Sequence, residues 1–162
     1  MSDIIQLLEE MRASSGDAVT IGLPNNVILD FAKRDSNIVM AIEEGHSKQS
    51  EFNSEHLMMH ETDLISHLQE DFVNFYSPAT VNPYVAISAR GPWVVTSHGA
   101  VLHDNGGYGM LGGGHGPSEI IDVMSENHVM ANVMTASFSQ ARLAEALKLS
   151  LIHISEPTRR LS

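Results

Sequence analysis

The sequence contains no cysteine, one tryptophan and only nine lysine and arginine residues among 162. Without cysteine, the chain can form neither a disulfide framework nor a thiolate metal site. It has no apolar run long enough to cross a bilayer, and the first residues, MSDIIQLLEE, lack the basic start and apolar centre of a secretory signal. We therefore expect a cytoplasmic protein with no membrane partner.

Basic residues are outnumbered by acidic ones, 9 to 20, which gives a formal net charge of −11. The acidic residues are scattered along the first two thirds of the chain and do not form a tail. A field of this sign repels phosphate backbones and anionic lipids, so we expect no nucleic-acid partner. The length allows one domain and is too short for a two-domain enzyme.

Two short helices are predicted by hydrophobic periodicity, at Val27 to Ala32 and at Ile38 to Glu44. Asp35 or Ser36 should cap the second of them, because short polar side chains accept hydrogen bonds from the first free amides of a helix. Gly45 should end it, since glycine commonly follows the last helical residue.

Two further helices are predicted on either side of this pair. Apolar residues near the N-terminus recur at helical spacing as far as Gly16, and a longer apolar stripe runs from Glu55 to about Phe75 behind Ser54, a potential cap. This second segment should be the longest helix of the chain.

The pattern changes after residue 76. Pro78, Pro83 and Pro92 exclude a helix interior and favour an extended path across the surface. The β-rich runs WVVTS and AVLHD are separated by His98 and Gly99, and this arrangement predicts a β-hairpin.

A glycine-rich loop, NGGYGMLGGGHG, follows the predicted hairpin. Pro117 should then open one helix, and Ser137 with Gln140 forms a capping-box start for another. We therefore predict an α+β fold with a helical leader over 1–76 and a hairpin, glycine loop and two helices over 77–148.

Within the loop, Gly107, Gly109 and Gly112 satisfy the GxGxxG pattern of dinucleotide-binding folds. In those folds the helix begins inside the motif, so that its N-terminus faces the pyrophosphate. Here further glycines and Pro117 delay the helix, and the preceding strand belongs to a hairpin. The match is therefore a weak indication of a nucleotide site.

His56 and His60 are spaced by one helical turn and could share a metal ion. No third ligand is evident, and the HExxH pattern is absent, so two half-exposed histidines on a packed helix are the simpler interpretation. His98, His103 and His115 are expected to serve turns and strand ends. No serine lies in a GxSxG elbow, so a hydrolase nucleophile is not indicated.

The end of the chain, residues 149–162, reads LSLIHISEPTRRLS. Through Arg159 it resembles the translation of a sequencing adapter and is expected to be a non-native tail. Pro157 should break any continuation of the preceding helix. We therefore expect that the natural product continued beyond Lys148 with a different sequence.

The stretch GPWVVTSHGAVLHDNGGYGMLGGGHGPSEIIDVM resembles the opening of class III pyridoxal-phosphate-dependent aminotransferases. The motif of that family is matched by Gly91, Gly99, Asp104, Gly112, Gly114, His115 and Pro117. The resemblance covers about residues 75–148, and the acidic leader with the NFYSPATVNPYVA run is similar to a lysine 6-transaminase-like subgroup. One departure is Gly116, where the family often has histidine.

The resemblance implies a fold-type I enzyme that uses pyridoxal 5'-phosphate in a homodimer and transfers an amino group from an amino acid or amine to a 2-oxo acid. Such an enzyme needs a lysine desolvated enough to form a Schiff base. Lys33 and Lys48 lie in charged or polar segments, and Lys148 adjoins the tail. We therefore expect an N-terminal fragment that is inactive alone, with no catalytic, cofactor-binding or metal-binding residue of its own.

Within such a parent enzyme, we predict that Phe75, Tyr76, Tyr108 and Met110 approach the substrate, because aromatic and flexible apolar groups suit a pocket wall. Phe75 and Tyr108 could instead only pack within the leader and on the hairpin. Two other functions remain open from the sequence: a small acidic helical binding module, and an HxxxH metal-binding protein.

Overall fold

The computed structural model describes residues 2–73, 77, 83–105, 112–127 and 134–159. The chain divides into two compact units, Met1–Ile121 and Asp122–Ser162. The first unit combines helices with a three-stranded antiparallel sheet of order β1-β2-β3, which confirms the α+β class. In the described residues, no helix has the length and apolar character needed to cross a membrane.

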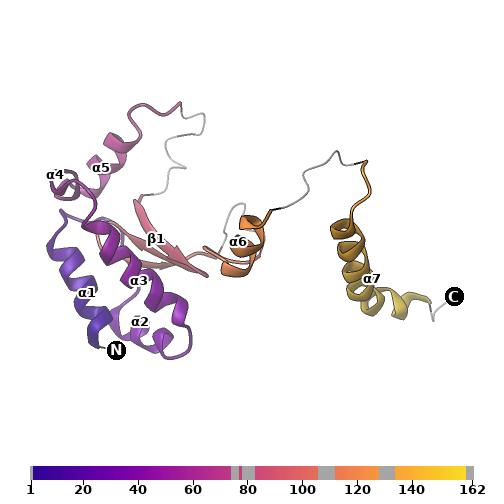
Figure 1. Cartoon of the computed structure of the whole chain (residues 1–162). Coiled ribbons are helices and arrows are strands. Elements are labelled where there is room, and N and C mark those ends of the chain that lie inside the picture. The colour runs from indigo at the N-terminus through magenta and orange to yellow at the C-terminus, as the bar shows by residue number, and fades with distance from the viewer. Residues whose placement is uncertain (1, 74–76, 78–82, 106–111, 128–133, 160–162) are drawn as a thin grey trace. The chain divides into compact units, whose positions relative to one another are not determined.

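The helices of the leader pack together and onto the sheet. They are α1 (Ser2–Ala13), α2 (Asn25–Ala32) and α3 (Ser36–Gln49). Figure 1 shows α1 and α3 side by side, and α3 also contacts β1 and β2. Their inward faces form one hydrophobic core with the sheet, which includes Leu8, Met11, Ile28, Ile42, Trp93 and Val95.

Helix α3 is longer than predicted, and Gly45 does not end it. The helix continues to Gln49, and Gly45 is buried in its interior. A Cβ atom at this position would lie 2.8 Å from Ser88 Oγ and 3.1 Å from Val95 Cγ1. Glycine is therefore required for close approach of α3 to the sheet, and the prediction of a helix end was wrong.

The prediction of one long helix from Glu55 to Phe75 was also wrong. Two short helices take its place, α4 (Ser54–Leu57), capped by Asn53, and α5 (Glu61–Leu68), capped by His60. Phe72, which was expected on the apolar stripe, lies beyond α5 and is exposed.

Backbone contacts from the leader explain this break. The amide of Glu61 donates to Asp17 O at 2.9 Å, and Leu57 O accepts from the amide of Gly16 at 2.8 Å. In a continuous helix, the amide of Glu61 would instead donate to the carbonyl of Leu57, four residues earlier. The fully buried carboxylate of Glu61 also accepts from the amides of Val19 and Thr20, which ties the chain after α1 to the start of α5.

The predicted hairpin is confirmed as β2 (Trp93–Thr96) and β3 (Val101–His103). Gly99 has a φ of 73° in the connecting turn. The sheet has one more strand, β1 (Ala86–Arg90), which pairs antiparallel with β2. Proline-rich flanks had indicated only an extended surface path here, so this strand was missed.

The remaining helices are α6 (Ser118–Ser125) and α7 (Phe138–Arg159). Pro117 directly precedes α6, and Ser137 Oγ accepts from the amide of Gln140 at 3.3 Å, so both predicted starts are confirmed. Because α7 extends to Arg159, the prediction that Pro157 breaks it was wrong. The proline lies only two residues before the end of the helix.

Trp93 is the central aromatic residue of the core. It is 2% exposed, its ring lies 4.8 Å from that of Phe31, and its Nε1 donates to Asp35 Oδ2 at 2.7 Å. Asp35 Oδ1 accepts from the amide of Asn37 and thereby caps α3, as one of the two sequence alternatives predicted. One carboxylate therefore joins the start of α3 to the core tryptophan.

We predict that Gly45→Val lowers the free energy of unfolding by about 1–3 kcal/mol, because the added atoms collide with the sheet. The matched control is Ser47→Val, which places the same side chain at an exposed position of α3 and should change stability by less than about 0.5 kcal/mol. Urea unfolding measures both values. Equal effects would show that α3 does not approach the sheet as described.

Asp35 should make stability depend on pH. Partial burial raises the pKa of this carboxyl, but hydrogen bonds from Trp93 and from Asn37 outweigh it and hold the pKa below its ordinary value. The stabilisation is present above the unfolded pKa of about 3.9 and is lost as pH falls through the lower folded value. Asp35→Asn should cost about 1 kcal/mol near neutral pH, because the bonds to a charged acceptor are lost.

The native protein and the Asp35→Asn variant should then differ less in their free energy of unfolding as the pH falls below the unfolded pKa of Asp35. Urea unfolding at a series of pH values measures this difference. A difference that stays constant across the series would contradict the assignment of these bonds to the ionised form.

Candidate functional site

Both ends of the glycine-rich loop are held against the β1–β2 turn. The amide of Gly91 donates to His115 O at 2.9 Å, and the amide of His115 donates to Gly91 O at 2.7 Å. These two bonds form an isolated antiparallel bridge beside the end of β1. We refer to residues 90–92, 103–104 and 114–116 as the loop anchor.

Asp104 secures the opposite end of the loop. Its amide donates to Pro92 O at 2.7 Å, and its Oδ2 lies 3.1 Å from Nε2 of His115. The two side chains are 27% and 30% exposed, so the pair is partly screened from water. The start and the end of the loop therefore meet at one side-chain contact.

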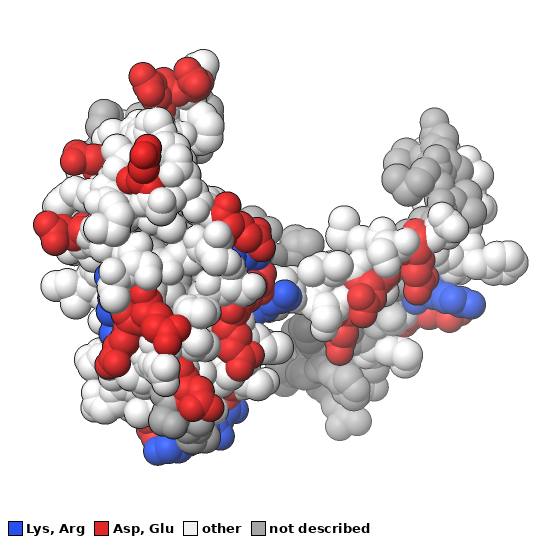
Figure 2. Space-filling view, turned by 60° about the vertical axis from the view of Figure 1, so that its left-hand side comes forward, with Lys and Arg blue, Asp and Glu red and all other residues white. Residues whose placement is uncertain are grey.

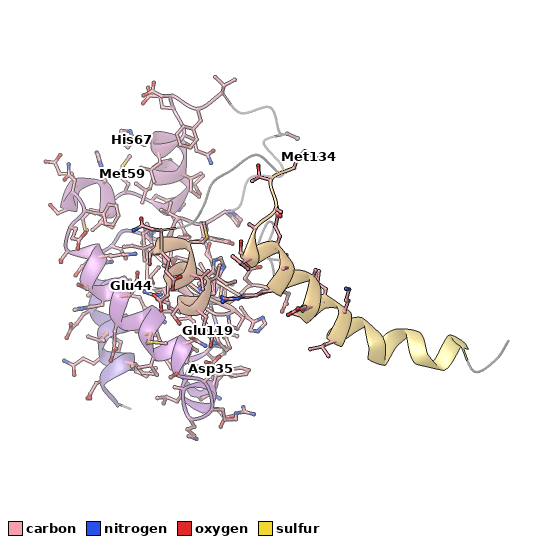
Figure 3. The ribbon with its side chains drawn as sticks, turned by 45° about the vertical axis from the view of Figure 1, so that its right-hand side comes forward. Asp35, Glu44, Met59, His67, Glu119 and Met134 are labelled. Carbon is pink, nitrogen blue, oxygen red and sulfur yellow. The ribbon has the colours of Figure 1, made fainter. Side chains whose placement is uncertain are left out.

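Arg90 connects the loop anchor to α3. Its Nε donates to Glu44 Oε2 at 2.9 Å, and its Nη1 reaches Gly116 O at 3.4 Å. Lys48 Nζ lies 2.6 Å from the other oxygen of Glu44. The hydrogen bond from Lys48 lowers the pKa of Glu44, burial partly opposes this, and Arg90 lowers it further. Figure 3 shows Glu44 on α3.

The backbone at the loop anchor requires glycine. Gly91, Gly114 and Gly116 have φ values of 53°, 73° and 59°, in the left-handed region that side chains disfavour. A Cβ at Gly114 would also lie 2.8 Å from Gly91 Cα. At Gly116, where the aminotransferase motif often has histidine, a side chain would also collide, because a Cβ there would lie 2.6 Å from Arg90 Nη1.

This geometry suits the positioning of a loop better than catalysis. The His115–Asp104 pair has the form of a base and its orienting carboxylate, but within the described residues no hydroxyl group is recorded as a partner of His115. The guanidinium of Arg90 is engaged by Glu44. The loop anchor can therefore hold the ends of a loop whose own residues would contact a ligand.

The four residues predicted to approach a substrate, Phe75, Tyr76, Tyr108 and Met110, all lie outside the described residues. Their placement stays a prediction.

The three lysines lie at the surface. Lys33 is 59% exposed with its ammonium 3.5 Å from Asp30, and Lys48 is 43% exposed beside Glu44. Lys148 is exposed on α7. A Schiff-base lysine needs a desolvated amine, so these side chains do not fit that role.

His56 and His60 do not form the predicted one-turn pair, because α4 ends at Leu57. His60 Nδ1 accepts from the amide of Thr62 and caps α5, whereas the ring of His56 lies 4.5 Å from that of His67. Throughout the described ranges, no three potential histidine, aspartate or glutamate ligands are grouped for a metal ion. A metal-binding function gains no support from this arrangement.

Glu44 and Arg90 were not singled out from the sequence, although they tie the loop anchor to the leader. They are separated by 46 residues, and neither lies in a recognisable motif. Their contact depends on how α3 crosses the sheet, so no local pattern could have indicated it.

No family model matches the chain, and neither a curated protein nor a solved structure matches it significantly. The resemblance to class III aminotransferases therefore rests on the residues of this chain.

We predict that Gly114→Ala destabilises the first unit more than Gly112→Ala does. Both glycines have a positive φ, 73° and 78°, so alanine is strained at either position by about 1–2 kcal/mol. Only at Gly114 does a Cβ also collide with Gly91, whereas at Gly112 nothing lies within 4 Å. The collision should add about 1–3 kcal/mol to the loss in unfolding free energy measured in urea. Equal losses would contradict the loop anchor.

Proposed function

We propose that this chain is the N-terminal part of a class III, fold-type I pyridoxal-phosphate-dependent aminotransferase. The parent enzyme would transfer an amino group from an amino acid or amine to a 2-oxo acid as a cytoplasmic homodimer. The chain by itself would supply a wall of the active-site entrance and no catalytic group.

The observation that carries this proposal is the convergence of the motif residues. Gly91, Asp104, Gly114 and His115 are spread over 25 positions of the sequence, yet they meet at the loop anchor. Two other matched positions also have defined roles, since Gly99 turns the hairpin and Pro117 precedes α6. A chance match would not be expected to place these residues together.

A second observation agrees with further protein packing against this chain. On α7, Phe138 is 90% exposed, and Leu143 and Leu147, which share one helix face, are 61% and 51% exposed. Apolar groups gathered in this way commonly mark an interaction surface. The large domain of the parent enzyme is the partner that the proposal supplies for it.

The lysines of the described residues are unsuited to binding pyridoxal phosphate covalently. Pyridoxal phosphate needs an amine that can lose its proton near neutral pH, and Lys33, Lys48 and Lys148 are all exposed. We therefore assign no reaction step to this chain. Its proposed contribution is steric: the loop anchor fixes the ends of the glycine loop, and Tyr108 and Met110 on that loop would face the substrate.

The chain mixed with pyridoxal phosphate and treated with borohydride should carry no stoichiometric adduct on one lysine, because exposed amines are largely protonated at neutral pH. Mass spectrometry of peptides locates any adduct. The control is the triple variant Lys33→Arg, Lys48→Arg and Lys148→Arg, which sets the background. One specific, stoichiometric adduct would show that the chain holds the cofactor itself.

The aminotransferase activity of the proposed parent enzyme is tested on the product of the natural gene, sequenced beyond codon 148. That product should give a single borohydride-trapped lysine and should convert 2-oxo acids to amino acids in the presence of an amino donor. A natural gene product without such a lysine would refute the aminotransferase proposal.

A further inference from the structure

An apolar cavity of about 100 Å³ lies between α4, α5 and the start of β1. Leu57 and Leu64, which are 7% and 3% exposed, line its interior. Phe52 and Leu68 also line it and are 56% and 47% exposed, so they form an open rim. The cavity therefore has a buried apolar end and an end that meets the solvent.

The two polar residues of the lining already contact other side chains of the fold. Ser97 is 3% exposed, its Oγ lies 3.0 Å from Nδ1 of His98, and its carbonyl accepts from Gln49 Nε2 at 2.8 Å. The ring of His56 lies 4.5 Å from the ring of His67, which Figure 3 shows at the α4–α5 end of the unit. A water molecule needs two or more polar partners to occupy a buried site. The cavity therefore favours an apolar group over water.

The described residues that line the cavity include no carboxylate, lysine or arginine. Figure 2 shows acidic side chains spread over the visible face of the leader with few basic ones among them. Glu51 and Glu55 adjoin lining residues in the sequence, but both are exposed and do not line the cavity themselves. A charged group placed against this lining would lose water without gaining an ion pair. The cavity therefore favours an uncharged ligand.

We infer that this cavity binds a small uncharged molecule with a linear apolar stem, of the class of the short-chain alcohols. The stem lies against Leu57 and Leu64, and the hydroxyl group stays in water at the rim. The length of the stem follows from the volume. A cavity of about 150 Å³ accepts the six carbons of benzene, so about 100 Å³ accepts about four carbons by the same proportion. The inference does not depend on the aminotransferase proposal.

A series of primary alcohols added to the full chain tests the length of the stem. 1-Butanol should bind with a dissociation constant in the millimolar range. Each methylene group buried contributes about fourfold in affinity, so 1-propanol should bind about fourfold and ethanol about fifteenfold more weakly. Beyond four carbons the stem no longer fits, and 1-pentanol and 1-hexanol should gain less than about twofold per added methylene group. Backbone amide shifts of Leu57, Leu64 and Ile87, followed by NMR during titration, measure each constant.

Two ligands with the same four-carbon stem and a charged end test whether the ligand must be uncharged. Neither butylammonium nor pentanoate should bind more tightly than 1-butanol, because the described lining gives neither charge a partner. The same amide shifts measure both affinities.

Ala86→Leu fills the cavity from its lining. Ala86 begins β1, lines the cavity and is exposed, so a larger side chain can be placed there without displacing the core. The three added carbons take up most of a space for four, and the affinity for 1-butanol should fall at least about tenfold. Ala13→Leu makes the same change at the exposed end of α1, which does not line the cavity, and should leave the affinity unchanged.

Three outcomes would overturn the inference. The first is an affinity that keeps rising about fourfold per methylene group through 1-hexanol, as unspecific partition would give, or no saturable shift with any alcohol. The second is tighter binding of butylammonium or pentanoate than of 1-butanol. The third is a folded Ala86→Leu variant that binds 1-butanol as well as the unsubstituted chain does. The alcohol series uses the unsubstituted chain, so it stays decisive if the variant does not fold.

Discussion

The structure of the first unit depends on the close contact between α3 and the sheet. Gly45 allows this contact, because any larger residue would collide with Ser88 and Val95. Ser88 Oγ donates to Ala41 O, so a side chain of β1 also bonds to the backbone of the helix. With the helix fixed at this distance, Glu44, which directly precedes Gly45, reaches Arg90 at the end of β1.

The loop anchor follows from that placement. Arg90, held by Glu44, bonds to the carbonyl of Gly116, and the neighbouring Gly91 pairs with His115. The geometry of the glycine loop is therefore set partly by a helix that lies far from it in sequence. This connection gives the acidic leader a structural role in holding the loop.

Local features of the fold could be read from the sequence. The hairpin, the helix start at Pro117, the Ser137 cap and the Asp35 cap each depend on a few neighbouring residues, and each is found. The failures have a common cause in tertiary contacts. Gly45 has the residue type of a helix end but serves close packing, and the helix predicted from Glu55 to Phe75 is interrupted because Asp17 and Gly16 take its backbone partners.

The candidate site, like the fold, was predictable only where its residues lie close together in the sequence. The glycines, Asp104 and His115 were singled out by the resemblance to the aminotransferase motif, in which they lie within one short stretch of sequence. The Arg90–Glu44 contact and the cavity beneath α4 and α5 combine elements from distant parts of the chain, so they needed the packed structure. Phe75, Tyr76, Tyr108 and Met110 stay predictions, since they lie outside the described residues.

Hydrogen exchange of individual backbone amides tests most directly whether the loop anchor belongs to the same packed unit as the sheet. The amides of Gly91 and His115 should exchange nearly as slowly as those of β2, because they open only when that unit opens. Free exchange at Gly91 and His115 while β2 stays protected would show that the loop ends are not held by the fold.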